Sequence, residues 1–99
     1  MRVVYAPQAV TDLRKIGRES RRVFGASVAA ALETYIRATV ARIAVMPESG
    51  QRLPARPAVR VVPLVRYPFK LFYAVADETV TISIFDMPRV GHGASSDRQ

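Results

Sequence analysis

The sequence predicts a two-layer α+β fold in which an N-terminal helical hairpin packs on an antiparallel β-sheet, with elements in the order β-α-α-β-β-β. Two stretches carry this prediction. Residues 67–86 contain two runs of alternating residues separated by Asp77-Glu78, as is typical of a β-hairpin. Residues 7–46 contain apolar residues three and four positions apart, as is typical of amphipathic helices.

The register of the hairpin follows from a two-residue turn at Asp77-Glu78. The predicted pairs are Ala76/Thr79, Val75/Val80, Tyr73/Ile82 and Leu71/Ile84. Because residues directly opposite one another share a face, the last three pairs give one apolar face. The other face is mixed and holds Lys70, Phe72 and Phe85. A four-residue loop leaves the faces unchanged, and since Asp-Glu is not a favoured pair for a tight primed turn, the turn type stays open.

The remaining elements are predicted from composition and periodicity. They are a strand at 2–5, a helix at about 7–18, a basic connector at 17–25, a helix at about 27–46, an extended loop at 51–57 and a strand at 58–64. Pro7 suits the first position of a helix, and Pro47 ends the second helix. In the strand at 58–64, Arg60 and Val62 share one face, while Pro63 removes a backbone donor and limits pairing.

The chain is predicted to form one domain over residues 1–90, followed by a mobile tail over residues 91–99. Its 99 residues, 49% of them hydrophobic, suffice for a modest core. The sequence contains no cysteine, so disulfides and thiolate metal sites are excluded. No stretch predicts a signal peptide or a membrane span, and we expect a soluble cytoplasmic protein without a membrane partner.

The charge is strongly basic. The net charge is +7, the isoelectric point is near 10.8, and 13 of the 15 basic residues are arginine. Such a surface favours an anionic partner, either nucleic acid or an acidic protein segment. A GC-rich genome would also supply arginine in place of lysine without any role in binding.

No standard catalytic or metal-binding motif is present, so the residues alone predict no catalytic group, no metal ion and no cofactor. The only histidine, His92, lies between two glycines in the predicted tail, where a general base or metal ligand would lack a fixed geometry. Asp77 and Glu78 lie at the hairpin tip, and Asp86 is expected to pair with Arg66 or Arg89. We therefore expect these carboxylates to be structural.

Basic and aromatic side chains are expected to gather on the sheet face that the helices leave open. The candidate contact residues for a target or partner are Arg60, Arg66, Lys70, Phe72, Phe85 and Arg89. Basic groups beside aromatic rings suit single-stranded nucleic acid, and they suit an acidic protein segment equally. A second basic cluster is predicted at a solvated helix end, with a role in docking or solubility: Arg14, Lys15, Arg18, Arg21 and Arg22.

Several short motifs follow one another in a characteristic order and spacing. They are Ala9-Val10-x-Asp12-Leu13-x-x-Ile16, Ile43-Ala-Val-Met-Pro47-Glu-Ser-Gly50-Gln-Arg52, Val59-Arg60 and Tyr67-Pro-Phe-Lys-Leu-Phe-Tyr73-Ala-Val. In these motifs the chain resembles the ParE/RelE superfamily of bacterial toxin–antitoxin toxins over about residues 2–90. The resemblance implies a compact toxin fold and a hetero-oligomer with a cognate antitoxin. The acidic C-terminal segment of that antitoxin would lie along the sheet edge or against the helical hairpin.

Two toxic activities occur in the superfamily that the chain resembles. ParE-like members poison DNA gyrase, whereas RelE-like members cleave mRNA on the ribosome with basic side chains and often a C-terminal tyrosine. This chain has Val61 and Pro63 where RelE-like strands carry lysines, and Ser96 at the tyrosine position. If the chain were a ribonuclease, the catalytic side chains would be Lys70, Arg89 and Arg60. The turn at 47–52 is more similar to ParE, so the resemblance implies a gyrase inhibitor. The alternatives are a ribosome-dependent ribonuclease and a non-toxic antitoxin-binding module.

Overall fold

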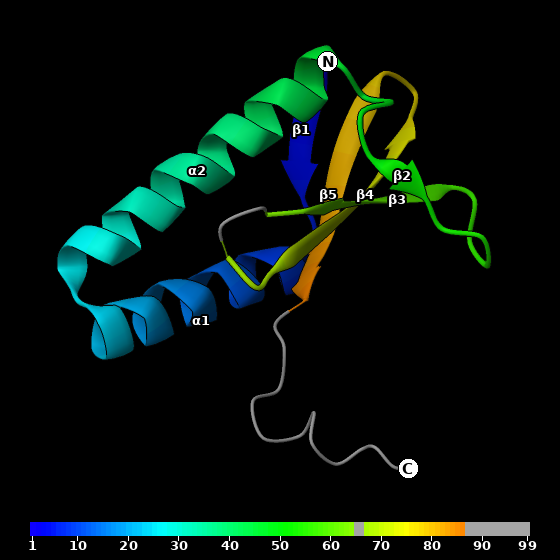
Figure 1. Cartoon of the computed structure of the whole chain (residues 1–99). Coiled ribbons are helices and arrows are strands. Elements are labelled where there is room, and N and C mark those ends of the chain that lie inside the picture. Colours follow the sequence, from blue (N-terminus) through cyan, green and yellow to red (C-terminus); the bar gives the residue numbers. More distant parts are fainter. Residues whose placement is uncertain (65–66, 87–99) are drawn as a thin grey trace, which may run out of the picture.

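The computed structural model describes residues 1–64 and 67–86, and it shows a helical hairpin lying over one face of a five-stranded sheet (Figure 1). The elements are β1 (Arg2–Tyr5), α1 (Pro7–Phe24), α2 (Ala26–Val45), β2 (Gln51–Arg52), β3 (Val59–Pro63), β4 (Lys70–Ala76) and β5 (Thr79–Asp86). The strand order in the sheet is β1-β5-β4-β3-β2. The predicted α+β class is confirmed. The tail predicted at 91–99 lies outside the described residues.

The sheet differs from the prediction in two respects. β1 runs parallel to β5, so the sheet is mixed, whereas the prediction described an antiparallel sheet without a parallel pair at β1. The segment predicted as an extended loop contains the short strand β2, which pairs with β3. Both differences concern pairing between segments that no tight turn connects, and a tight turn is what makes antiparallel pairing predictable.

The first helix is longer than predicted. α1 continues to Phe24, so most of the predicted basic connector is helical. The buried positions Ala9, Ile16 and Ser20 lie along one helical stripe, but Ser20 is polar and interrupted the apolar pattern in the sequence. The helix ends at Gly25, whose φ of 94° is readily adopted only by glycine.

The β4–β5 hairpin turns at Asp77 and Glu78, whose φ angles of 52° and 60° correspond to a type I′ turn. The predicted register is confirmed from Ala76/Thr79 through Tyr73/Ile82. The turn type, left open by the sequence, is thus the one that matches the natural twist of a hairpin.

Farther from the turn, the register shifts at a bulge in β5. Phe72 pairs with Ile84 rather than with Ser83, and Leu71 pairs with Phe85. The predicted Leu71/Ile84 pair is therefore wrong. A bulge adds one residue to one strand and reverses the face on which the following side chains lie. As a result, Phe85 enters the core, where it is only 3% exposed.

The core lies between the helices and the face of the sheet that they cover. Its buried apolar residues are Ala9, Ile16, Leu32, Ile36, Val40, Ile43, Val62, Leu64, Leu71, Tyr73, Val80, Ile82 and Phe85. Asp12 of α1 accepts a hydrogen bond from the Phe85 backbone N–H at 3.0 Å and one from Gln8 at 2.8 Å. This carboxylate therefore joins α1 to β5 next to the bulge. In the described part of the chain, no helix is long and apolar enough to cross a membrane.

Candidate functional site

The two faces of the sheet differ in chemistry, and the strand register assigns each residue to one of them. Arg60 pairs with Tyr73, which is fully buried beneath the helices, so Arg60 lies on the covered face. Val61 pairs with Phe72 and Pro63 pairs with Lys70, and these four residues lie on the open face. Lys70 is exposed and Phe72 is half-buried there.

The predicted contact residues therefore do not form one surface. Lys70 and Phe72 share the open face as predicted. Arg60 lies on the opposite face, and Phe85 is in the core because of the bulge, so the placement of these two on the open face was wrong. Arg66 and Arg89 lie outside the described residues, as does His92.

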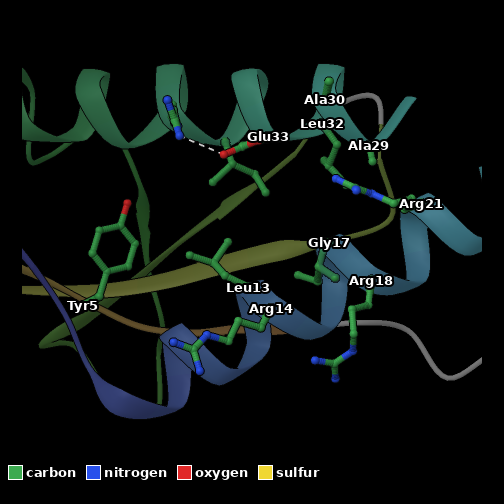
Figure 2. Close-up of a pocket in the computed structure, with 13 residues that line it drawn as sticks. Tyr5, Leu13, Arg14, Gly17, Arg18, Arg21, Ala29, Ala30, Leu32 and Glu33 are labelled. Carbon is green, nitrogen blue, oxygen red and sulfur yellow. Dashed lines mark hydrogen bonds and ion pairs between the residues drawn. The ribbon is translucent and has the colours of Figure 1, made fainter. Parts of the chain in front are cut away.

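A groove of about 620 Å³ lies between the two helices. The sequence analysis did not predict the groove, but three arginines of the predicted second basic cluster line it. Its lining is Tyr5, Leu13, Arg14, Ile16, Gly17, Arg18, Arg21, Ala29, Ala30, Leu32, Glu33, Ile36 and Arg37. Figure 2 shows Arg21 extending from α1 toward α2, while the guanidinium groups of Arg14 and Arg18, which also line the groove, point away from α2. In the sequence, these three arginines are four and three positions apart. This spacing places them along one side of α1, provided that the helix extends to Phe24.

The rim of the groove carries excess positive charge. Arg37 forms an ion pair with Glu33 at 2.8 Å, whereas in the described part of the chain no ion pair involves Arg14, Arg18 or Arg21. The side chain of Tyr5 points from β1 toward α2 (Figure 2), and burial raises the pKa of its hydroxyl, an effect that Arg37 opposes. Tyr5 is therefore neutral at physiological pH. The groove combines an apolar floor with three cations that form no close ion pair among the described side chains, although Glu19 attracts Arg18 at longer range.

A smaller cavity of about 420 Å³ lies past the C-terminal end of α2. It is lined by Met1, Pro47, Glu48, Arg52, Pro57, Ala58, Arg60 and Val75, none of which lines the interhelical groove. Its arginines come from neighbouring strands, because Arg52 of β2 pairs with Arg60 of β3. The sequence analysis included Arg60 among the contact residues but not Arg52.

The turn beside this cavity is held by two buried or half-buried side chains. The Tyr73 hydroxyl donates to the Pro47 carbonyl and accepts from the Gly50 N–H, both at 2.8 Å. The Arg60 guanidinium donates from Nη1 to the Gly50 carbonyl at 2.8 Å and to the Glu48 carbonyl at 3.4 Å. These bonds satisfy backbone groups that follow α2 and fix the position of the turn.

The described residues contain no group of three or more side chains suited to hold a metal ion. On the open face, the described side chains include the cations Arg2 and Lys70, and no histidine is among them. Asp86 is opposite Lys70 in the register, but its side chain lies outside the described ones. This face can attract an anion, but its described part lacks an obvious general base.

Comparison with known proteins places this geometry in a family. A family model described as the ParE toxin of the type II toxin–antitoxin system parDE matches residues 3–96. No curated protein matches the sequence. Among solved structures, the chain is similar to the chromosomal ParDE toxin–antitoxin system of P. aeruginosa, with a TM-score of 0.76 and 23% identity over 90% of this chain and 97% of that chain.

Structures of the E. coli RelE toxin share the fold at lower similarity. A mutant of that toxin in complex with a peptide of the antitoxin RelB gives a TM-score of 0.69 and 16% identity over 99% of this chain and 94% of that chain. The intact E. coli RelBE toxin–antitoxin complex gives a TM-score of 0.61 and 17% identity over 89% of this chain and 96% of that chain. Together with the family match over nearly the whole sequence, these results show that the chain belongs to the ParE toxin family of type II toxin–antitoxin systems.

Proposed function

We propose that the chain is a ParE-like toxin that inhibits DNA gyrase and is neutralised by a cognate antitoxin. The observation that carries this proposal is the composition of the open face. Val61 and Pro63 lie there beside Lys70 and Phe72, at positions where a RelE-like ribonuclease would need basic side chains. The match to the ParE family model supports the same conclusion.

A ribosome-dependent ribonuclease is the second candidate, and the open face argues against it. Cleavage of RNA without a metal requires a group to activate the 2′-hydroxyl, a cation to stabilise the phosphorane and an acid to protonate the leaving oxygen. Lys70 could supply the cation. Among the described side chains next to Lys70, Val61, Pro63 and Phe72 supply no base. The register also places Asp86 opposite Lys70, and the side chain of Asp86 lies outside the described ones. Lys70 and Phe72 remain candidates for contact with a protein target rather than for catalysis.

We place the antitoxin in the interhelical groove. The floor of the groove is apolar, through Leu13, Ile16 and Leu32 among others, and its rim carries Arg14, Arg18 and Arg21. An amphipathic segment with aliphatic side chains on one side and carboxylates on the other would satisfy both. The net charge of +7 favours such an acidic partner. The family resemblance implies two locations for the antitoxin, the sheet edge and the helical hairpin, and this proposal favours the helical hairpin.

Expression of the toxin in bacterial cells that carry a reporter of DNA damage tests the proposed target. A gyrase inhibitor that traps cleaved DNA is expected to activate the reporter before protein synthesis falls, because double-strand breaks are its direct product. Co-expression of the antitoxin is expected to suppress both effects. A fall in protein synthesis with fragmented mRNA and a silent reporter would contradict the proposal and favour the ribonuclease.

A further inference from the structure

Arg52 and Arg60 form a like-charged pair across β2 and β3. Because they are directly opposite in the register, their Cβ atoms are about 4.5–5.5 Å apart, and like charges in this relation destabilise a sheet. In the part of the chain that the structure describes, no ion pair neutralises either residue. The nearest acidic residue of the cavity, Glu48, contacts Arg60 through its backbone carbonyl. Two adjacent guanidinium groups with donors to spare are suited to hold an anion.

The Arg60 guanidinium has N–H groups available for a ligand, because its hydrogen bonds to described residues use only some of them. Its two hydrogen bonds to described residues both use Nη1, so none of the described residues occupies the N–H groups of Nε and Nη2, which can donate to a ligand. Those same bonds orient the guanidinium, which lowers the entropy lost when it binds. Arg52 is exposed beside it and can complete the contact from β2.

The surroundings of the pair are aliphatic and favour a protein ligand over nucleic acid. The cavity walls include Pro47, Pro57 and Val75, and among the described residues no aromatic ring on which a base could stack lines it. Immediately before Pro47, Val45 is 79% exposed and Met46 is 57% exposed. Adjacent exposed apolar side chains at the end of a helix are typical of a surface that a partner covers.

We propose that Arg52 and Arg60 clamp an acidic side chain of the protein that this toxin inhibits, and that an aliphatic neighbour of that side chain packs against Val45 and Met46. This inference rests on the proposed function, since it assumes a protein target. The cavity shares no lining residue with the interhelical groove. Its lining residues Pro47 and Glu48 follow the C-terminal end of α2, which is the end opposite the loop that joins the helices (Figure 1). The clamp is therefore a contact for the target, distinct from the antitoxin site.

The variant Arg52→Glu tests the clamp without weakening the fold. Glutamate at this position would face Arg60 and replace a repulsive pair by an attractive one, so the midpoint of thermal unfolding is expected to stay the same or rise. The variant is expected to weaken growth inhibition in cells, and binding to purified gyrase, by a factor of about 10 to 100. Its affinity for the antitoxin is expected to stay within about twofold of wild type, because the sites are separate. Arg56→Glu is the matched control, because Arg56 is exposed in the segment between β2 and β3 and is not among the residues that line the cavity.

Two results would overturn the proposal. The first is that Arg52→Glu inhibits growth as strongly as Arg56→Glu, whereas Lys70→Glu inhibits growth less. The target contact would then lie on the open face. If Arg52→Glu loses antitoxin affinity, the cavity belongs to the antitoxin interface. Failure of the wild-type toxin to bind gyrase would count against the proposed function alone. Growth inhibition by Arg52→Glu and Arg56→Glu does not depend on which protein is the target, so its comparison would still decide whether the clamp contacts that target.

Discussion

Replacement of Tyr73 by phenylalanine is expected to lower the free energy of unfolding by about 2–6 kcal/mol, because each of two backbone groups loses its partner at a cost of about 1–3 kcal/mol. The hydroxyl of this fully buried residue bonds the Pro47 carbonyl and the Gly50 N–H. Phenylalanine keeps the ring in place and leaves both groups without that partner. Urea denaturation of the two proteins, monitored by far-UV circular dichroism, measures the difference.

Tyr67→Phe is the control for the loss of a hydroxyl. Tyr67 is half-buried and its ring packs on Tyr35 at a centroid distance of 5.6 Å, a contact that phenylalanine keeps. No hydrogen bond of the Tyr67 hydroxyl occurs within the described residues, so we expect a change below about 0.5 kcal/mol. Equal stability of Tyr73→Phe and Tyr67→Phe would show that Tyr73 does not hold the turn.

The same contact explains why Gly50 follows α2. A Cβ atom on residue 50 would lie 2.7 Å from the Tyr73 hydroxyl oxygen and 2.8 Å from a carbon of its ring. Since the ring is buried, it has little room to move away. The motif from Pro47 to Arg52, which entered the sequence analysis as a family resemblance, thus has a physical basis in a turn fastened by Tyr73 and Arg60.

Charge reversal at the groove is expected to have the largest effect on partner binding. The double variant Arg18→Glu/Arg21→Glu places two carboxylates at the rim where we expect the carboxylates of the antitoxin. The resulting repulsion, with the loss of two attractive contacts, is expected to weaken antitoxin binding about 100-fold or more. Isothermal titration calorimetry of purified toxin variants with the antitoxin measures the loss.

The matched control is Lys15→Glu/Arg22→Glu, which makes the same change in net charge on the same helix. Neither residue lines the groove, and the Arg22–Glu19 ion pair that it removes is exposed and contributes little. The control is expected to retain affinity within about threefold, since only long-range, screened attraction changes. If both double variants lose affinity equally, net charge rather than the groove determines binding.

The sequence predicted local elements better than the surfaces built from them. The helical hairpin and the hairpin register near Asp77-Glu78 were predictable, because periodicity and a tight turn fix them locally. The bulge at Ser83 was not predictable, because the strict alternation of side chains assumes that every residue of the two strands is paired. This single extra residue places Phe85 in the core rather than on the open face. Arg60 was misplaced for a related reason: its face depends on the pairing of β3 with β4, which lie on either side of a loop.

The groove and the second cavity were beyond prediction for a different reason. The groove depends on the angle between α1 and α2 and on the extension of α1 to Phe24. The extension was not predicted because Ser20 is polar and interrupts the apolar periodicity. The Arg52–Arg60 pair depends on β2, a strand of two residues that is too short to show any alternation. In both cases the basic residues were visible in the sequence, but their neighbours were set by packing between distant segments.

The most direct test of the proposed activity is incubation of the purified toxin with DNA gyrase, ATP and supercoiled plasmid, followed by denaturation and electrophoresis. We expect linear plasmid to accumulate with toxin concentration and to disappear when the antitoxin is added first. Plasmid that stays intact at micromolar toxin would contradict the assignment of gyrase as target. Cleavage of mRNA in a parallel reaction with translating ribosomes would then identify the chain as a ribonuclease, and inactivity in both reactions would favour a non-toxic antitoxin-binding module.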